Sequence, residues 1–182
     1  MRRVRRSAIH LTWQAGVILA LLVVAGCDGG EDAQFTTPSD IESSPQTVTV
    51  PIDHVADVSD PYNLVALSTN IFTGRIDGQS GVKALGSLPE TQYRVTTGLN
   101  VKGTVPQTVV LNQQGGRFGD RYISFGGDRP LEIGQWYLFF TRYLQRENWY
   151  TVIPVHGDKP ISEADANNNA SALIDAVVRI VG

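Results

Sequence analysis

The chain has 182 residues, with 15 Lys and Arg against 18 Asp and Glu, so its formal net charge is −3 at neutral pH. This acidic balance argues against a nucleic-acid partner, because affinity for nucleic acid comes largely from basic side chains that neutralise phosphates. The single cysteine excludes an internal disulfide and a thiolate metal site, and without another ligand motif we expect no cofactor.

The first 26 residues have the layout of an export signal. Four arginines precede an uncharged apolar run, residues 15–25, and small residues then lead to Cys27. The run is shorter than the roughly 20 apolar residues that span a bilayer, so it indicates a secretory signal peptide and not a transmembrane helix. The paired arginines also permit twin-arginine export, but the residues after them are weakly apolar, which favours the general secretory route.

The end of this segment, Val24-Ala25-Gly26-Cys27, resembles the bacterial lipobox. The resemblance implies that a dedicated peptidase removes residues 1–26 and that the thiol of Cys27 is acylated. Because two or more acyl chains anchor a protein stably, it also implies a lipid-anchored protein on the extracytoplasmic side of the cell membrane, with the lipid bilayer as a partner. The alternative is an ordinary signal peptide followed by a chance cysteine.

The mature chain would consist of a tether and one domain. Without residues 1–26 it has eleven basic and eighteen acidic residues, a formal net charge of −7. Residues 28–47 are acidic, rich in Ser, Thr, Gly and Pro, and nearly free of apolar side chains, which is typical of a segment that cannot fold alone. We therefore expect residues 27–47 to be the lipidated cysteine and a flexible tether, and residues 48–182 to be a single domain.

Within the domain, short β-type stretches are separated by turn signals. Gly98 lies inside an alternating pattern of apolar and polar residues, which predicts a bulge or a barrel bend. The expected turns include Asp77-Gly78, Ser80-Gly81 and Gly115-Gly116. The expected strands are residues 64–76, 92–102, 108–113, 122–125, 135–144 and 149–155.

The stretch 135–144 is the most apolar of these strands. Its two faces carry Trp136, Leu138 and Phe140 on one side and Tyr137, Phe139 and Tyr143 on the other. Two apolar faces predict a central strand with the barrel core on one side and the C-terminal helix on the other. An aromatic platform for a ligand is the alternative.

The end of the chain has helical spacing. Ser162 or Asn169 is expected to cap the helix, because both side chains can accept a hydrogen bond from its first backbone N–H groups. The apolar residues with this spacing are Leu173, Ile174, Val177, Val178 and Val181. Strands followed by one helix favour a mostly β fold, a small five- to six-stranded barrel with a C-terminal α-helix, over a parallel α/β architecture.

A second resemblance supports this fold. It rests on Phe72-Thr73-Gly74, Val101-Lys102-Gly103, the Gly115-Gly116 turn and residues 132–140. Their succession is similar to bacterial secreted domains of the oligonucleotide/oligosaccharide-binding (OB) barrel type, related in shape to netrin-like and metalloproteinase-inhibitor modules. The resemblance covers about residues 62–157 and implies an OB-like barrel. It does not imply proteinase inhibition, which in that family needs a free amino group on an N-terminal cysteine.

The sequence contains little material for catalysis. It has no Gly-x-Ser-x-Gly elbow, and the cysteine is expected to carry lipid. His54 lies near Asp53 and Asp57 at a spacing that matches no established metal-ligand pattern, and His156 precedes a turn signal. We therefore expect no catalytic and no metal-binding residues. The alternative is an envelope hydrolase with a cleft where acids or the two histidines converge.

Positive charge and aromatic area gather in one glycine-rich segment, residues 115–134. It lacks the ending of a phosphate-binding loop, but a mixture of arginine and aromatic side chains suits contact with a protein or a glycan. The candidate binding residues are Arg117, Phe118, Arg121, Tyr122 and Arg129. The sequence thus predicts a binding module for an envelope protein or glycan, with a structural accessory of an envelope complex as a further alternative.

Overall fold

The computed structural model describes residues 46–168 and 171–182. The expected signal peptide, Cys27 and nearly all of the expected tether lie outside these residues. In the part of the chain that is described, no helix has the length and hydrophobicity needed to cross a membrane.

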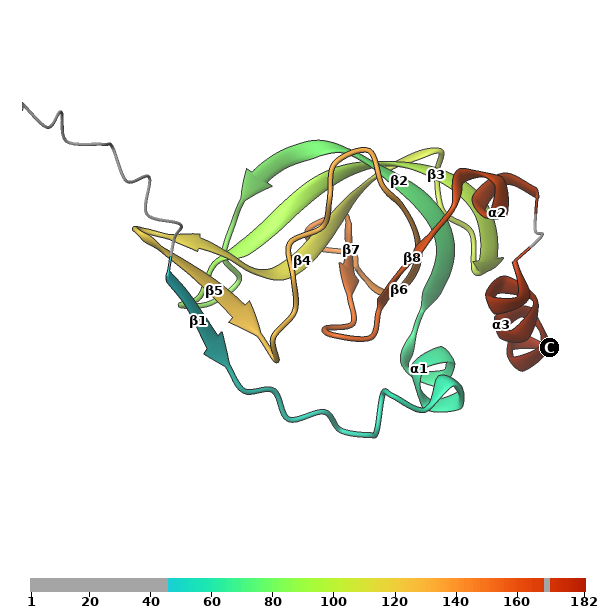
Figure 1. Ribbon diagram of the computed structural model, residues 1–182, viewed down its shortest axis with the longest axis horizontal. Helices are drawn as coiled ribbons and strands as arrows, with labels where there is room; N and C mark the ends of the chain where they lie inside the picture. Colours follow the sequence, from blue (N-terminus) through green and yellow to red (C-terminus); the bar gives the residue numbers. More distant parts are fainter. Residues whose placement is uncertain (1–45, 169–170) are drawn as a thin grey trace, which may run out of the picture. The chain divides into compact units, whose positions relative to one another are not determined.

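Five strands close into a barrel (Figure 1). Neighbouring strands pair antiparallel in the order β4-β3-β2-β6-β7, and β7 then pairs parallel with β4 to close the barrel. This closure consists of only two residue pairs, Leu111 with Tyr150 and Asn112 with Thr151. The strands are β2 (Asn70–Val82), β3 (Glu90–Lys102), β4 (Thr108–Phe118), β6 (Trp136–Leu144) and β7 (Trp149–Val152).

Three further strands extend the sheet. β5 (Arg121–Phe125) forms a hairpin with β4, and β1 (Gln46–Val50) lies parallel to β5. β8 (Asp158–Ile161) pairs with the first half of β6, the half that β7 does not reach. The predicted mostly β barrel with a C-terminal helix is thus confirmed.

Within residues 46–168 and 171–182, the helices are α1 (Pro61–Leu67), α2 (Glu163–Asn168) and α3 (Ala172–Val181). Strand β6 divides two hydrophobic clusters: Phe139 faces the barrel interior, where its ring centroid is 5.7 Å from that of Phe72, and Leu138 faces the cluster that contains Ile174 and Val177 of α3. The predicted central strand, with core on one side and helix on the other, is confirmed. Both clusters lie within residues 46–182, so this region has a hydrophobic core of its own.

The cap of the terminal helix differs from the prediction. The hydroxyl of Ser171 accepts a hydrogen bond from the backbone N–H of Leu173 at 3.3 Å, so Ser171 caps α3. Ser162 lies one helix earlier, where its hydroxyl accepts from the N–H of Asp165 at 3.1 Å. Asn169 is outside the described residues. The sequence predicted one helix with one cap, whereas the structure has two successive helices, with Ser162 at the start of α2 and Ser171 at the start of α3.

The start of the expected strand 64–76 is a helix instead. Asp60 caps α1 by accepting from the N–H of Tyr62 at 2.8 Å, and Pro61 occupies the first turn, where its missing N–H costs nothing. Leu64 and Val65 are buried in the cluster beside α3. The β-type residues of this stretch therefore pack as one helical turn, and the strand begins only at Asn70.

Glycine pairs that predicted turns lie inside strands. β2 runs through Asp77-Gly78 and Ser80-Gly81 by means of register shifts, and the chain turns only after Val82. β4 likewise runs through Gly115-Gly116. A Cβ at Gly116 would lie 2.4 Å from the Thr91 hydroxyl, and its φ is +145°, so glycine is needed there for close strand approach. The predicted bulge at Gly98 is confirmed by a register shift in the β2–β3 pairing.

Candidate functional site

The residues expected to form a binding loop lie on the β4–β5 hairpin and just after it. Arg117 is paired with Tyr122, and Phe118 is paired with Arg121. Residues opposite each other share a face of a sheet and successive residues alternate, so these two pairs lie on opposite faces. Arg117 and Arg121 are exposed, and 60% of the Phe118 surface is accessible.

Tyr122 does not project freely from the hairpin. It is half-buried, and burial, followed by the neighbouring Tyr93 and Asp128, raises its pKa to about 12. The backbone carbonyl of Arg129 accepts a hydrogen bond from the Gln113 amide at 2.6 Å, while its side chain is exposed. The structure therefore places Arg117, Phe118 and Arg121 exposed at the hairpin tip, whereas Tyr122 is half-buried and Arg129 follows the hairpin.

A groove that the sequence did not predict lies on the barrel wall. Its volume is about 320 Å³, and the β6–β7 hairpin contributes Tyr143, Asn148 and Tyr150. Arg94 of β3 and Thr108 at the start of β4 also line it. We call this surface the tyrosine groove.

The tyrosine groove combines aromatic and polar groups. The rings of Tyr143 and Tyr150 are 4.8 Å apart between centroids, and Tyr143, which is 40% exposed, donates its hydroxyl hydrogen to the Asn148 side-chain oxygen at 2.8 Å. This contact leaves the Asn148 amide N–H groups directed elsewhere. Arg94 is exposed, and among the described residues it forms no ion pair. The groove therefore offers a ring face, an amide and a guanidinium.

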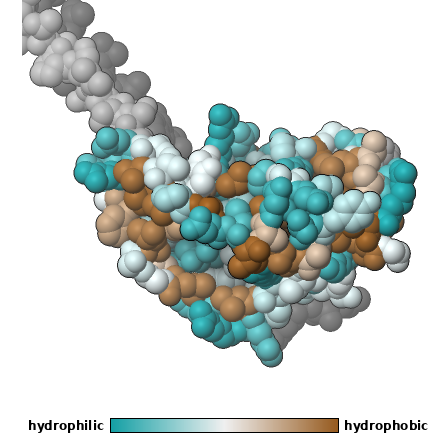
Figure 2. Space-filling model, turned by 90° about the horizontal axis from the view of Figure 1, so that it is seen from below, coloured by the Kyte–Doolittle hydropathy of each residue, from teal (hydrophilic) through white to brown (hydrophobic). Residues whose placement is uncertain are grey.

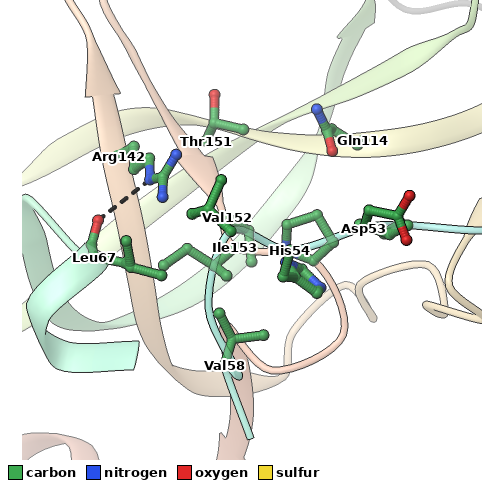
Figure 3. A pocket seen from close by; sticks show the side chains of 12 residues that line it. Asp53, His54, Val58, Leu67, Gln114, Arg142, Thr151, Val152 and Ile153 are labelled. Atoms are coloured by element: carbon green, nitrogen blue, oxygen red, sulfur yellow. Dashed lines mark hydrogen bonds between the residues drawn. The ribbon is translucent and has the colours of Figure 1, made fainter. Parts of the chain in front are cut away.

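A second pocket lies between the segment 52–58 and the strands β4, β6 and β7 (Figure 3). Its volume is about 240 Å³. Arg142 of β6 lies at one end, and Asp53 and His54 belong to its wall. We call it the arginine pocket.

The two histidines of the domain differ in burial and in surroundings. Burial lowers the pKa of His156, and the positive charges of Lys159 and His54 lower it further. His54 is exposed and His156 is half-buried. Within residues 46–168 and 171–182, no group of three or more His, Cys, Asp or Glu side chains could hold a metal ion.

Asp128 and Asp158 are two half-buried carboxylates with raised pKa values. Burial, and then the neighbouring Asp128, raises the pKa of Asp158 to about 7, and burial also raises the pKa of Asp128. The backbone N–H of Val155 donates to Asp128, and Val155 has a φ of +70°, which is unfavourable for a β-branched residue. Neither carboxylate lines the tyrosine groove or the arginine pocket.

No protein-family model matches this chain, and no curated protein matches it in sequence. Figure 2 shows one face of the molecule, on which hydrophobic side chains form separate areas among hydrophilic ones. That face offers no single broad apolar surface, so the grooves and the exposed hairpin are the candidate binding surfaces.

Sequence reasoning missed Tyr143, Asn148 and Arg94 as possible binding residues. The signal was present in part, because the stretch between Trp136 and Tyr150 holds seven of the fifteen aromatic residues. The alternation along β6 correctly assigned Tyr137, Phe139 and Phe140 to the core. Which aromatic ring stays exposed depends on where the barrel wall ends, and that is a property of strand pairing.

Proposed function

We propose that this protein is a membrane-anchored extracytoplasmic lipoprotein whose barrel is a non-catalytic binding module for a glycan of the cell envelope. The signal-like N-terminus and Val24-Ala25-Gly26-Cys27 support the anchor. The tyrosine groove supports the binding role, and the exposed ring of Tyr143 in its lining is the observation that carries the proposal.

The order of strand pairing supports an OB-like barrel. Counting only the barrel strands, the first pairs with the second and the fourth, and the third closes on the fifth in parallel. OB barrels bind oligonucleotides and oligosaccharides on the face of their second and third strands, flanked by the loop between the fourth and fifth. Here those elements are β3, β4 and the β6–β7 hairpin, which all line the tyrosine groove.

The chemistry of the groove favours a saccharide over a nucleic acid. Nucleic-acid binding needs a concentration of Lys and Arg, whereas Arg94 is the one basic residue that lines this groove. The amphipathic ring of Tyr143 can pack against the apolar face of a sugar. The Asn148 amide and the Arg94 guanidinium can donate hydrogen bonds to sugar hydroxyls.

The test is sedimentation of the purified full chain with insoluble peptidoglycan, together with titration of soluble envelope oligosaccharides. The variant Tyr143→Ala is expected to weaken binding by about tenfold, because aromatic residues in the centre of an interface carry much of its energy. Tyr62→Ala is the matched control, since Tyr62 on α1 is 68% exposed and outside the groove. Equal binding by both variants, or no saccharide binding by the wild type, would contradict the proposal.

A protein partner is the second candidate, and one observation favours it. Phe118 is 60% exposed opposite Arg121 at the tip of the β4–β5 hairpin, and such a pair suits the centre of a protein interface. Crosslinking in intact cells, comparing wild type with the double variant Arg117→Ala/Arg121→Ala, tests it. Loss of a crosslinked protein in the variant would support this role, which includes that of a structural accessory. The hydrolase alternative has less support, because the paired acids line neither groove.

A further inference from the structure

The arginine pocket shares no lining residue with the tyrosine groove. It lies where the barrel seam ends, because β7 pairs with β4 only as far as Asn112 and Thr151. Gln114, two residues beyond Asn112, and Val152, which follows Thr151, both line the pocket. The segment 52–58 runs past the end of this seam and also lines the pocket (Figure 3). A local divergence of strands therefore creates the cavity.

The floor of the pocket is aliphatic. Val58, Val152 and Ile153 line it, and each is at most 5% exposed. Leu67 and Ile52 add partly buried aliphatic surface beside them. These side chains are held by the surrounding core, so the floor exists before any ligand binds, and an aliphatic group placed on it would leave water.

One end of the pocket is polar and positive. The Nε–H of Arg142 donates to the backbone carbonyl of Leu67 at 3.2 Å, which orients the guanidinium. Its other four N–H groups have no acceptor among the described residues. Thr151 also lines the pocket, but its hydroxyl points away from the guanidinium in Figure 3 and accepts a hydrogen bond from the Asn112 amide at 3.4 Å. The free N–H groups of the guanidinium thus have no carboxylate opposite them.

The acidic member of the wall lies elsewhere. Asp53 occupies the other side of the pocket in Figure 3, and its carboxylate is directed away from Arg142. The charge distribution is therefore asymmetric, with a guanidinium at one end of an aliphatic floor. An acid with an aliphatic chain matches this arrangement, because its carboxylate can accept two parallel N–H bonds from arginine while its chain covers the floor.

We propose that the arginine pocket binds a small aliphatic carboxylate, with the guanidinium of Arg142 holding the carboxylate and Val152 and Ile153 contacting the chain. The volume of about 240 Å³ corresponds to roughly eight waters at about 30 Å³ each, so it suits an acid of about eight non-hydrogen atoms. The carboxylate belongs either to a free short-chain acid or to the aliphatic C-terminal residue of a peptide.

The experiment follows methyl resonances of the purified full chain while hexanoate is added. The methyl groups of Val152 and Ile153 are expected to shift, with a dissociation constant in the millimolar range because the ligand is small. Hexanamide is the matched ligand that lacks the charge, and it is expected to bind about tenfold more weakly.

Three variants test the role of the guanidinium. Arg142→Gln is expected to weaken hexanoate binding by about tenfold, and Arg142→Lys by a smaller factor, because lysine keeps the charge but not the planar fork. Arg117→Gln removes an exposed arginine from the β4–β5 hairpin and is expected to change nothing. Unchanged binding by Arg142→Gln, or an equal loss in Arg117→Gln, overturns the proposal.

A pair of tetrapeptides ending in leucine, one with a free C-terminus and one amidated, distinguishes the two sources of the carboxylate. Tighter binding of the free peptide than of hexanoate identifies a polypeptide C-terminus as the ligand. Tighter binding of hexanoate identifies a free acid. If neither compound shifts the methyl groups of Val152 and Ile153, the pocket does not bind aliphatic carboxylates. None of these outcomes supports or contradicts saccharide binding at the tyrosine groove, which is a separate site.

Discussion

Replacing Asp158 by asparagine is expected to make the domain more stable at pH 8 while leaving it nearly unchanged at pH 4. Asp158 stands opposite Phe139 in the β6–β8 pairing, so its side chain lies on the same face of the sheet as a fully buried core ring. Burial there, together with the nearby charge of Asp128, raises the pKa of Asp158 to about 7 from an ordinary value of 3.8. The protonated carboxyl group and the asparagine amide are similar in shape and both uncharged.

The sign of the effect follows from proton binding. In the unfolded chain Asp158 loses its proton near pH 4, whereas in the folded protein it keeps the proton up to about pH 7. Between these values the folded state binds more protons, so the free energy of unfolding falls as the pH rises through this window. The stabilisation is complete below the unfolded pKa and is lost above the folded one.

The size of the effect follows from the shift of about three units in the pKa of Asp158. At about 1.4 kcal/mol per unit, the upper limit is about 4 kcal/mol. The side chain is not fully shielded from water, so we expect about half of this, roughly 2 kcal/mol. Asp128, whose pKa is also raised, changes stability in the same direction, and His156, whose pKa is lowered, changes it in the opposite direction. Both remain in the variant and largely cancel in the comparison.

Urea unfolding followed by tryptophan fluorescence measures the effect, because Trp136 and Trp149 lie in β6 and β7. The free energy of unfolding is compared between wild type and Asp158→Asn at several values from pH 4 to pH 8. Asp120→Asn, at the exposed tip of the β4–β5 hairpin, is the control and should follow the wild type throughout. Parallel pH profiles for wild type and Asp158→Asn would refute the assignment of a raised pKa to this half-buried carboxyl group.

Three other predictions follow from the fold and the N-terminus. Ile174→Ala, at a fully buried position of α3, should lower the free energy of unfolding by about 2–4 kcal/mol, whereas Leu173→Ala, at a 38% exposed position, should cost less than about 1 kcal/mol; similar urea midpoints would contradict the packing of α3. Gly98→Ala places a Cβ 2.5 Å from a threonine hydroxyl and should lower the melting temperature, while Gly86→Ala, with open space around it, should not. Cys27→Ser should abolish lipid attachment and membrane retention, as measured by intact mass and cell fractionation; unchanged retention would exclude the lipid anchor.

Local patterns in the sequence predicted the elements whose environment is the same along their length. β6 alternates between two apolar faces because one side meets the barrel core and the other meets α3, and this pattern is visible in residues 136–144 alone. The helical spacing of α3 was predicted from a similar repeat of apolar residues. The bulge at Gly98 was predicted because a glycine lies inside an alternating strand pattern. An amphipathic repeat reports burial directly, so no knowledge of the partner is needed.

Elements that depend on distant pairing were predicted poorly. Gly115-Gly116 has strong turn propensity, yet it lies in β4 because Thr91 and Ile123 approach it on either side. Residues 64–67 have β-type side chains, yet they form the end of α1 because their burial is against α3. In both cases contacts with residues far away in the sequence outweigh a local preference of a few tenths to about 1 kcal/mol.

The same division separates the candidate sites. Exposed arginine and phenylalanine side chains on the β4–β5 hairpin could be predicted from residues 117–121, because a hairpin tip is exposed wherever it lies. The tyrosine groove and the arginine pocket could not, because each joins strands that are distant in the chain around the closure of β7 on β4. By itself the sequence determined the class of fold, the two faces of β6, the terminal helix and the predicted export signal. Only the tertiary structure decided which strands close the barrel, and so which side chains line its grooves, because closure depends on the register of pairs such as Leu111 with Tyr150 that no local pattern encodes.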